Sequence, residues 1–313
     1  MNRPRYVLGS SQFKQQLKAS SIQSRPHLID PSLAQSRSTL CRALDSLTSQ
    51  VEAFTVIGSH AVHERTRSLP IESTSTKDAD LAITPELATG EPSISAKMRE
   101  AGFRPLAEIA RGLPTGHRGK RWESRPGLWG TDIAVDGSPV DELDLLVPEA
   151  LAGGRGRSAK TLPAHGKAMI GRVDGIELAV LERDLIELED FTSGTARPAY
   201  VARVSGIICA KAYKITDRLD SGRDARVFNV PKDAVDLWRC LSVGNPDSAR
   251  AEFDRHGGDQ RWGPAIQEGL VRTRRVLTDP AIVAMVSRRL PGHGLSEEQV
   301  EATFQPWREA FSR

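Results

Sequence analysis

Two short apolar runs, each bordered by unusual polar residues, set the strongest limit on how this chain can fold. The first run, residues 54–57, ends in a Gly-Ser pair. The second, residues 81–83, directly follows two aspartates, Asp78 and Asp80, that are separated by one alanine. Runs this short and apolar are typical of buried strands. Side chains alternate between the faces of a strand, so both aspartates are expected to point the same way.

A third acid, Asp144, interrupts the apolar strand that is expected over residues 140–148. A buried carboxylate without a partner costs several kcal/mol, and neighbouring carboxylates repel each other unless a cation neutralises them. Mg²⁺ binds oxygen ligands, and two such ions can clamp the oxygens of a phosphoryl transfer. The metal ligands and catalytic acids predicted in this way are Asp78, Asp80 and Asp144. Asp141 and Glu142 are interpreted as strand-entry residues, and the Asp-Ala-Asp string alone would also fit a turn or a helix cap.

The Gly-Ser pair adds a candidate phosphate site. Gly58 allows the backbone to approach an anion closely. A helix that begins at Ser59 would turn its free N–H groups and its positive end toward that anion. His60 and His63 lie one turn apart in the same expected helix. A core or surface role is favoured for them over metal binding, because no third nitrogen or sulfur ligand is evident.

The second half of the chain supplies cations. Lys211, Lys214 and Arg218 recur at i, i+3 and i+7, which places them on one face of a helix. Such a face would neutralise the phosphates of a nucleoside triphosphate opposite an acidic metal site, and it would equally suit a solvated surface. The next expected helix begins with Lys232, Asp233 and, one turn later, Asp236. These two acids either complement the positive end of their own helix or orient Lys211 or Arg218.

Composition and charge limit the remaining classes of protein. The chain is 39% hydrophobic, as in ordinary globular proteins, and its 5% aromatic content argues against a base-stacking platform. No apolar run is long enough to span a bilayer, and the first residues lack a secretory signal. The three cysteines have neither metal-ligand nor disulfide spacing and are interpreted as buried thiols. We therefore expect a cytoplasmic protein with no membrane partner.

Three stretches are strongly basic although the net charge is only +3. Residues 1–40 hold six lysines and arginines against one acid, and residues 111–125 hold five against one. Residues 155–172 contain basic residues and no acid. Such clusters attract polyanions without specifying them, and each would also fit a solvated loop.

The order of these patterns predicts an α+β fold in which helices segregate from a sheet. Helices are expected over residues 36–51 and 93–102, and strands over residues 54–57, 78–83, 104–110, 129–136 and 140–148. The Gly-rich residues 152–157 are interpreted as a hinge. From residue 200 onward nearly every segment favours a helix. The predicted parts are a basic N-terminal arm (1–35), a mixed α/β domain (36–195) and a helical C-terminal domain (196–313).

Taken together, these residues resemble the AbiEii/MenT-like branch of the DNA polymerase β-type nucleotidyltransferases. That family is marked by G-S, D-x-D, a third Asp, a K-L-x-A-x-x-x-R helix and a [KR]-D-x-x-D-L helix. The corresponding positions are Gly58-Ser59, Asp78 and Asp80, Asp144, Lys211 through Arg218, and Lys232-Asp233 through Asp236-Leu237. The resemblance covers residues 36–245. It departs from the family in a longer loop between the first two motifs, in Lys214, where Ala is common, and in Ala212, where Leu is usual.

The resemblance implies a nucleotidyltransferase-type mixed sheet with flanking helices and the Mg²⁺-dependent transfer of a nucleoside monophosphate from an NTP to an acceptor. Asp78 and Asp80 would hold two Mg²⁺ ions, and Asp144 would bind one of them and help to activate the acceptor hydroxyl. The predicted nucleotide-binding residues are Gly58, Ser59, Lys211, Lys214, Arg218, Lys232 and Asp233. Pyrophosphate would leave.

Several members of this family are toxins of toxin–antitoxin pairs, and some modify the 3′ end of tRNA. The resemblance thus implies three partners: an NTP, a tRNA acceptor that the basic stretches would suit, and a cognate antitoxin. Two other functions fit the residues. One is a catalytically silent nucleotidyltransferase-like module that binds RNA or a protein, and the other is an antibiotic-modifying nucleotidyltransferase.

Overall fold

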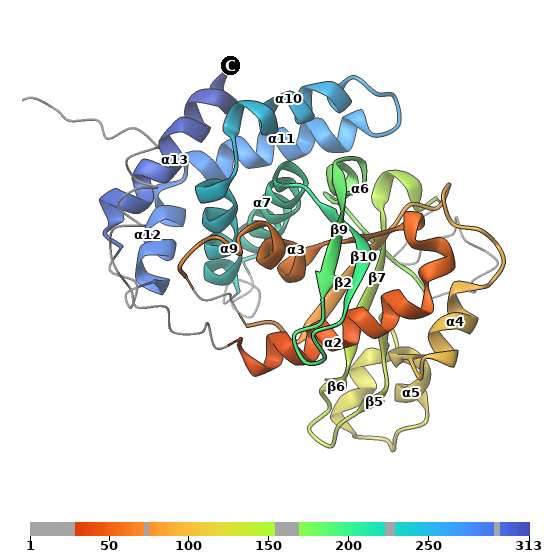
Figure 1. Cartoon of the computed structure of the whole chain (residues 1–313). Coiled ribbons are helices and arrows are strands. Elements are labelled where there is room, and N and C mark those ends of the chain that lie inside the picture. Colours follow the sequence, from red (N-terminus) through yellow and green to blue (C-terminus); the bar gives the residue numbers. More distant parts are fainter. Residues whose placement is uncertain (1–28, 72–74, 154–168, 223–228, 291–294) are drawn as a thin grey trace, which may run out of the picture.

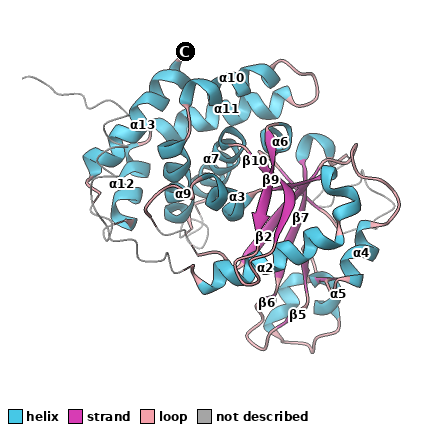
Figure 2. Ribbon diagram, in the orientation of Figure 1, coloured by secondary structure: helices cyan, strands magenta, loops and turns pink. Residues whose placement is uncertain are grey.

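The computed structural model describes residues 29–71, 75–153, 169–222, 229–290 and 295–313 (Figure 1). A mixed sheet with flanking helices is followed along the chain by a group of helices (Figure 2). The predicted α+β class is thereby confirmed. Most of the predicted N-terminal arm, part of the Gly-rich stretch 152–157 and most of the basic stretch 155–172 lie outside the described residues.

The described α-helices are α2 (Pro31–Ser46), α3 (Gly58–Arg65), α4 (Ile94–Glu100), α5 (Leu106–Arg111), α6 (Glu177–Leu181), α7 (Val204–Asp220), α9 (Val230–Val243), α10 (Pro246–Gly257), α11 (Gly263–Thr278), α12 (Pro280–Arg289) and α13 (Glu297–Ser312). The strands are β1 (Phe54–Val56), β2 (Asp78–Ile83), β3 (Arg104–Pro105), β4 (Leu128–Gly130), β5 (Asp132–Ile133), β6 (Pro139–Val140), β7 (Glu142–Pro148), β8 (Gly171–Val173), β9 (Arg183–Glu189) and β10 (Ala196–Ala202). Short 3₁₀ turns are η1 (Thr48–Ala53), η2 (Arg118–Trp122) and η3 (Glu149–Leu151).

The main sheet has the strand order β3-β4-β7-β2-β1-β10-β9, and β8 pairs with β7 outside this path. β2 runs parallel to β7 and antiparallel to β1, whereas β1 runs parallel to β10. β5 and β6 form a separate ribbon, which lies with α5 at one end of the molecule (Figure 1). Helix α2 packs across β2, β7 and β10. Helices α7 and α9 pack against α3, which brings the helical half to the C-terminal end of β1.

One hydrophobic core runs through both halves of the chain. It includes Leu40 of α2, Leu81 of β2, Ile208 of α7 and Trp307 of α13, all of which are buried. The domain boundary expected between residues 195 and 196 falls between β9 and β10, which pair with each other along their length. The sheet therefore extends to residue 202, and the division into two domains stays a prediction.

The structure corrects several expected elements. Helix α2 begins at Pro31, five residues earlier than expected, because the side chain of Asp30 accepts hydrogen bonds from the amides of Ser32 and Leu33. Residues 106–111 form helix α5 rather than a strand, since their buried residues recur at helical spacing. Residues 200–202, expected in a helix, belong to β10, and β9 has no counterpart among the predicted strands.

The cysteines meet the expectation from composition. The three cysteines, Cys41, Cys209 and Cys240, are free and buried. None of the helices in the described part of the chain is long and apolar enough to cross a membrane.

Candidate active site

The register of β2 and β7 brings four carboxylates onto one face of the sheet. Asp78 is paired with Glu142, and Asp80 is paired with Asp144. Paired residues on neighbouring strands point to the same face. The three predicted acids therefore lie together. The sequence reasoning missed Glu142 as a member of this group, because its position depends on a strand register that no local pattern reveals.

Gly58 lies directly against this acidic face. The amide of Ile57 donates to the carbonyl of Asp80 at 3.1 Å, which fixes the end of β1 beside β2. Gly58 then turns the chain into α3 with a φ of 63°, in the left-handed region that favours glycine. A Cβ at this position would lie 1.9 Å from Oδ2 of Asp80. The glycine is thus required both by its backbone angle and by the carboxylate beside it.

A cavity of about 160 Å³ opens between the first residues of β2 and helices α3, α7 and α9. Its lining consists of Ser59, Asp78, Asp80, Lys211, Lys214, Arg218, Asn229, Lys232 and Asp233. Eight of the ten predicted site residues are in this lining. The other two, Gly58 and Asp144, contact or pair with Asp80 just beside it.

Two of the predicted cations are held by acids of α9. The buried ammonium of Lys211 donates to Asp233 Oδ1 at 2.9 Å and to Asp236 Oδ2 at 2.5 Å. Arg218 forms an ion pair with the other oxygen of Asp233. Of the two interpretations of these acids, the structure therefore supports the one in which they orient the cations of α7.

Lys214 and Lys232 differ from these two cations. Both line the cavity, and neither forms an ion pair or a hydrogen bond with any of the described residues. Burial lowers the pKa of Lys232, while both lysines act electrostatically on Asp78 and Asp80. Their ammonium groups keep all their donors for an anion that enters the cavity.

Electrostatics in the acidic group favour the neutral form of two carboxyls. Burial raises the pKa of Asp80, and the charge of Asp78 adds to the rise, while Lys214 opposes it. Burial also raises the pKa of Asp144 well above its ordinary value, with further contributions from Asp80 and Glu142. Both carboxyls therefore lack enough positive charge around them when no ligand is present.

Asp78 and Glu142 are shifted in opposite directions. Burial acts to raise the pKa of Asp78, but the hydrogen bond from Thr76 Oγ1, at 2.6 Å, and the charge of Lys214 outweigh it and lower the pKa. Burial raises the pKa of Glu142 to about 7, and the charges of Asp78 and Asp80 contribute to the rise. At neutral pH the group thus combines one strongly acidic carboxylate with neighbours that readily take up a proton.

The site can be compared with Mg²⁺ through its pairs of acids, because the described residues do not form a complete set of metal ligands. Within the ranges that the structure describes, no group of three or more His, Cys, Asp or Glu side chains is arranged to hold a metal ion. However, Oδ1 of Asp144 is buried and has no hydrogen-bond partner among the described residues, and Asp80 is buried beside Asp78. Mg²⁺ usually binds through one or two carboxylates together with substrate phosphates. The acids present here fit an ion that enters with a triphosphate.

Part of the basic stretch 111–125 lies close to the acids. The charges of Arg125 and Arg121 act on Glu142 and lower its pKa, against the larger effect of burial. Both guanidinium groups stack on Trp122, at 5.1 and 4.8 Å from its ring centre. Arg118 and Arg111 are also exposed, whereas Lys120 is paired with Glu123. Of this basic stretch, Arg121 and Arg125 are therefore the residues that lie near the acidic group.

Buried polar contacts hold α3 against α2. Arg37, which is fully buried, forms a 2.7 Å ion pair with Glu64 and donates through Nε to His60 Nδ1 at 3.2 Å. His63 packs edge-on against Phe191, and burial lowers its pKa to about 3. Of the two roles expected for these histidines, core or surface, His60 has the core role. The contacts fix the helix whose first turn carries Gly58 and Ser59.

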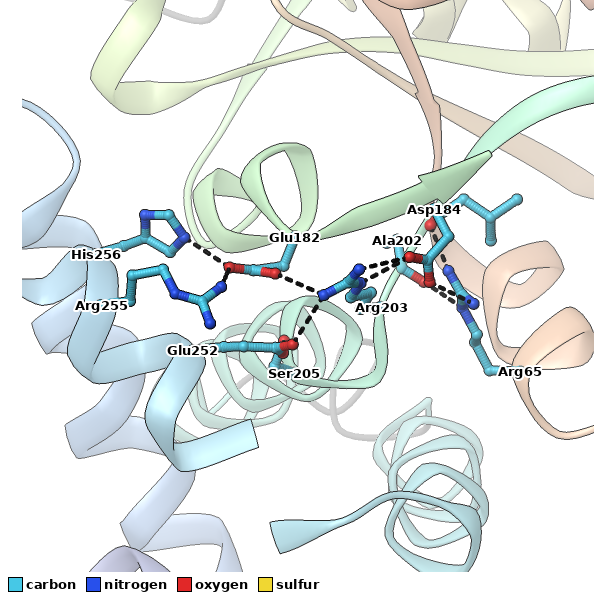
Figure 3. Close-up of polar contacts among 10 residues, drawn as sticks. Arg65, Glu182, Asp184, Ala202, Arg203, Ser205, Glu252, Arg255 and His256 are labelled. Carbon is cyan, nitrogen blue, oxygen red and sulfur yellow. Dashed lines mark hydrogen bonds and ion pairs between the residues drawn. The ribbon is translucent and has the colours of Figure 1, made fainter. Parts of the chain in front are cut away.

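A second polar cavity, of about 220 Å³, lies at the joint of α3, β9, α7 and α10. None of the predicted site residues is in its lining. Asp184 binds Arg65 and Arg203, and Arg203 also binds Glu182 and Glu252 (Figure 3). These charges neutralise one another, so we interpret this larger cavity as a structural joint.

The comparisons with known proteins identify no relative: no family model, no curated protein and no solved structure matches this chain.

Proposed function

We propose that this protein is a nucleotidyltransferase that moves a nucleoside monophosphate from an NTP to an acceptor hydroxyl with the help of Mg²⁺. One observation carries the proposal. Asp78 and Asp80 share a cavity with Lys214 and Lys232, while Asp144 lies in register with Asp80 at its edge. Carboxylates that lack a neutralising cation thus face ammonium groups that lack a bound anion. A metal–triphosphate complex would supply both.

Each part of the site has a task in this reaction. Asp78 and Asp80 would hold Mg²⁺, with Asp144 beside them. The metal, when bound, neutralises phosphate charge and polarises the phosphoryl group. Lys214 and Lys232 would donate to phosphate oxygens. Asp233 and Asp236 of α9 fix the positions of Lys211 and Arg218 beside them. The first turn of α3, at Gly58 and Ser59, would offer its amides and a hydroxyl to the terminal phosphates.

The proposed chemistry balances without a further reactant. The acceptor oxygen forms a bond to the α-phosphorus, and the bond from that phosphorus to the bridging oxygen breaks, so pyrophosphate leaves. The proton of the acceptor hydroxyl passes to Asp144. In the unliganded site the raised pKa of Asp144 favours its protonated form. With Mg²⁺ bound beside it, Asp144 would be a carboxylate that can accept this proton.

For the acceptor we propose a nucleic acid, and the family resemblance suggests the 3′ end of tRNA. The exposed guanidinium groups of Arg121 and Arg125 support this choice, because they lie close enough to the acids to affect Glu142. Arginines of this kind bind phosphates and position a strand without reading its sequence. An antitoxin partner and a cytoplasmic location are proposed on the resemblance and on composition.

The test is a labelling reaction. The protein is incubated with Mg²⁺, total RNA and each of the four NTPs, labelled at the α-phosphate, and the labelled macromolecule is identified. Asp80→Asn is expected to lower incorporation by roughly 100-fold or more, because it removes charge from the metal site. Asp247→Asn, which changes an exposed carboxylate on α10, is the matched control. Equal incorporation by wild type and Asp80→Asn would end the proposal.

Thermal stability separates the enzyme from a silent module. A ligand that binds only the folded state raises the melting temperature. Wild type is expected to gain stability with Mg²⁺ and an NTP together, and much less with either alone. RNA binding without any such gain would favour the silent module.

A further inference from the structure

Strand β9 ends the main sheet within the described residues, because it pairs with β10 on one side only. Its seven residues, RDLIELE, form one of the longest strands of the structure. The middle of its exposed face is Leu185, a leucine with 55% of its surface open to solvent. Long edge strands with exposed apolar residues are templates for pairing with another strand.

The hairpin geometry shows which backbone groups of β9 face outward. The amide of Asp190 donates to the carbonyl of Thr195, and the amide of Arg203 donates to the carbonyl of Glu182. The hydrogen-bonded pairs at the two ends of the hairpin therefore involve the even-numbered residues 182 and 190, which flank β9. In an antiparallel ladder, hydrogen-bonded and non-hydrogen-bonded pairs alternate. The even-numbered residues therefore point their amides and carbonyls toward β10. Those of residues 183, 185 and 187 point away from the sheet.

We propose that β9 pairs in antiparallel fashion with β9 of a second copy of this chain, about a twofold axis at Leu185. In this register the two Leu185 side chains lie opposite each other. Arg183 lies opposite Glu187 of the second copy, and the reverse pair lies on the other side of the axis. Within its own chain the Arg183 guanidinium donates to the carbonyl of Phe54 and to Thr55 Oγ1, so it would have to turn outward to reach Glu187. Cross-strand pairs of opposite charge and of two apolar residues stabilise a sheet, whereas like charges destabilise it. The face that carries residues 183, 185 and 187 is therefore complementary to itself in this register, whereas on the other face Asp184 lies opposite Ile186 of the second copy.

A neighbouring register is less favourable. Centring the axis on Ile186 would place Leu185 opposite Glu187 of the second copy. It would also require the carbonyl of Glu189, which already accepts a hydrogen bond from Arg37 Nη1 at 3.4 Å. The outward-facing backbone groups that can still pair with another strand are thus those of residues 183–187. The register centred on Leu185 pairs these same residues. This inference does not depend on the proposed function.

The first test is the mass of the protein in solution. A single pair of edge strands buries little surface and gives a weak complex, so the mass is measured at concentrations up to about 300 μM. Wild type is expected to rise from the 34.2 kDa monomer toward twice that mass. Leu185→Lys places two like charges across the axis and is expected to stay monomeric. Val271→Lys, at a position on α11 with 57% exposure, is the matched control and should behave as wild type.

The second test locates the axis. The native cysteines are buried, so an introduced surface cysteine is the thiol that a short bismaleimide can reach. At equal concentration, Leu185→Cys is expected to give a cross-linked dimer and Val271→Cys to give little. Equal cross-linking of both variants, or a wild-type mass that stays at 34.2 kDa throughout, would overturn the proposal. In the latter case β9 would be left as an edge for a strand of another protein.

Discussion

At the scale of single residues, Gly58 decides whether the candidate site can form. Its positive φ costs any other residue about 1–2 kcal/mol, and a Cβ would also meet the carboxylate of Asp80. Gly116 provides a comparison, because it too has a positive φ, but a Cβ added there would meet no atom of the described part of the chain within 4 Å. The two glycines therefore separate backbone strain from steric conflict.

We predict that Gly58→Ala lowers the free energy of unfolding by at least about 2 kcal/mol more than Gly116→Ala does. The extra loss comes from the displaced carboxylate of Asp80. Urea denaturation of both variants measures the difference. Equal losses in the two variants would show that Asp80 moves aside without cost.

The second prediction at this scale concerns Glu142 and pH. Its pKa in the folded protein is about 7, against an ordinary value of 4.5, so the folded state binds the proton more tightly than the unfolded state. The stability that this group gives to the folded state is therefore fully present below about pH 4.5 and is lost as pH rises through 7. Without divalent ions, we expect the free energy of unfolding to fall by about 2 kcal/mol between pH 5 and 8. Glu142→Gln should reduce this slope, and an unchanged slope would contradict the prediction.

At the scale of elements, Asp184 joins β9 to two helices that border the candidate site. Its carboxylate contacts Arg65 of α3 at 3.0 Å and Arg203, just before α7, at 2.7 Å (Figure 3). Arg65 also donates to the carbonyls of residues 201 and 202 in β10. The edge of the sheet is thereby tied to α3 and to the start of α7, the two helices that carry Ser59 and Lys211 of the candidate site.

We predict that Asp184→Ala lowers the free energy of unfolding by about 1 kcal/mol, because half-exposed ion pairs contribute modestly. Glu187→Ala, on the same strand, removes an exposed acid that has no ion pair with the described residues and should have little effect. Both variants are compared by urea denaturation at low protein concentration. A larger loss for Glu187→Ala would contradict the role given to Asp184.

Elements also show how much of the fold and the site can be predicted from sequence. The sequence predicts β2 at its observed bounds, because a short apolar run after two acids has few alternatives. The strand expected at α5 is wrong, since six residues with mixed polarity fit both periods. Strand β9 is held by its pairing with β10 rather than by its own pattern. Likewise, helical spacing places Lys211 and Lys214 on one face, but only the fold shows that the first is paired with acids.

At the scale of the whole molecule, the sheet and the helices share one core. The buried tryptophans report on both halves, with Trp129 in β4 and Trp238 and Trp307 in α9 and α13. We predict that unfolding monitored by tryptophan fluorescence and by circular dichroism gives coincident single transitions. Two separated transitions would instead support the division into independent domains.

The three buried thiols can be used to measure how often individual helices open locally. Cys41 lies in α2, Cys209 in α7 and Cys240 in α9, so each is shielded by a different part of the fold. A thiol reagent can reach them only when that part opens transiently. The order in which they are alkylated under native conditions would therefore rank these helices by how often they detach. Under the proposed function, a nucleotide bound between α7 and α9 would slow the reaction of Cys209 and Cys240.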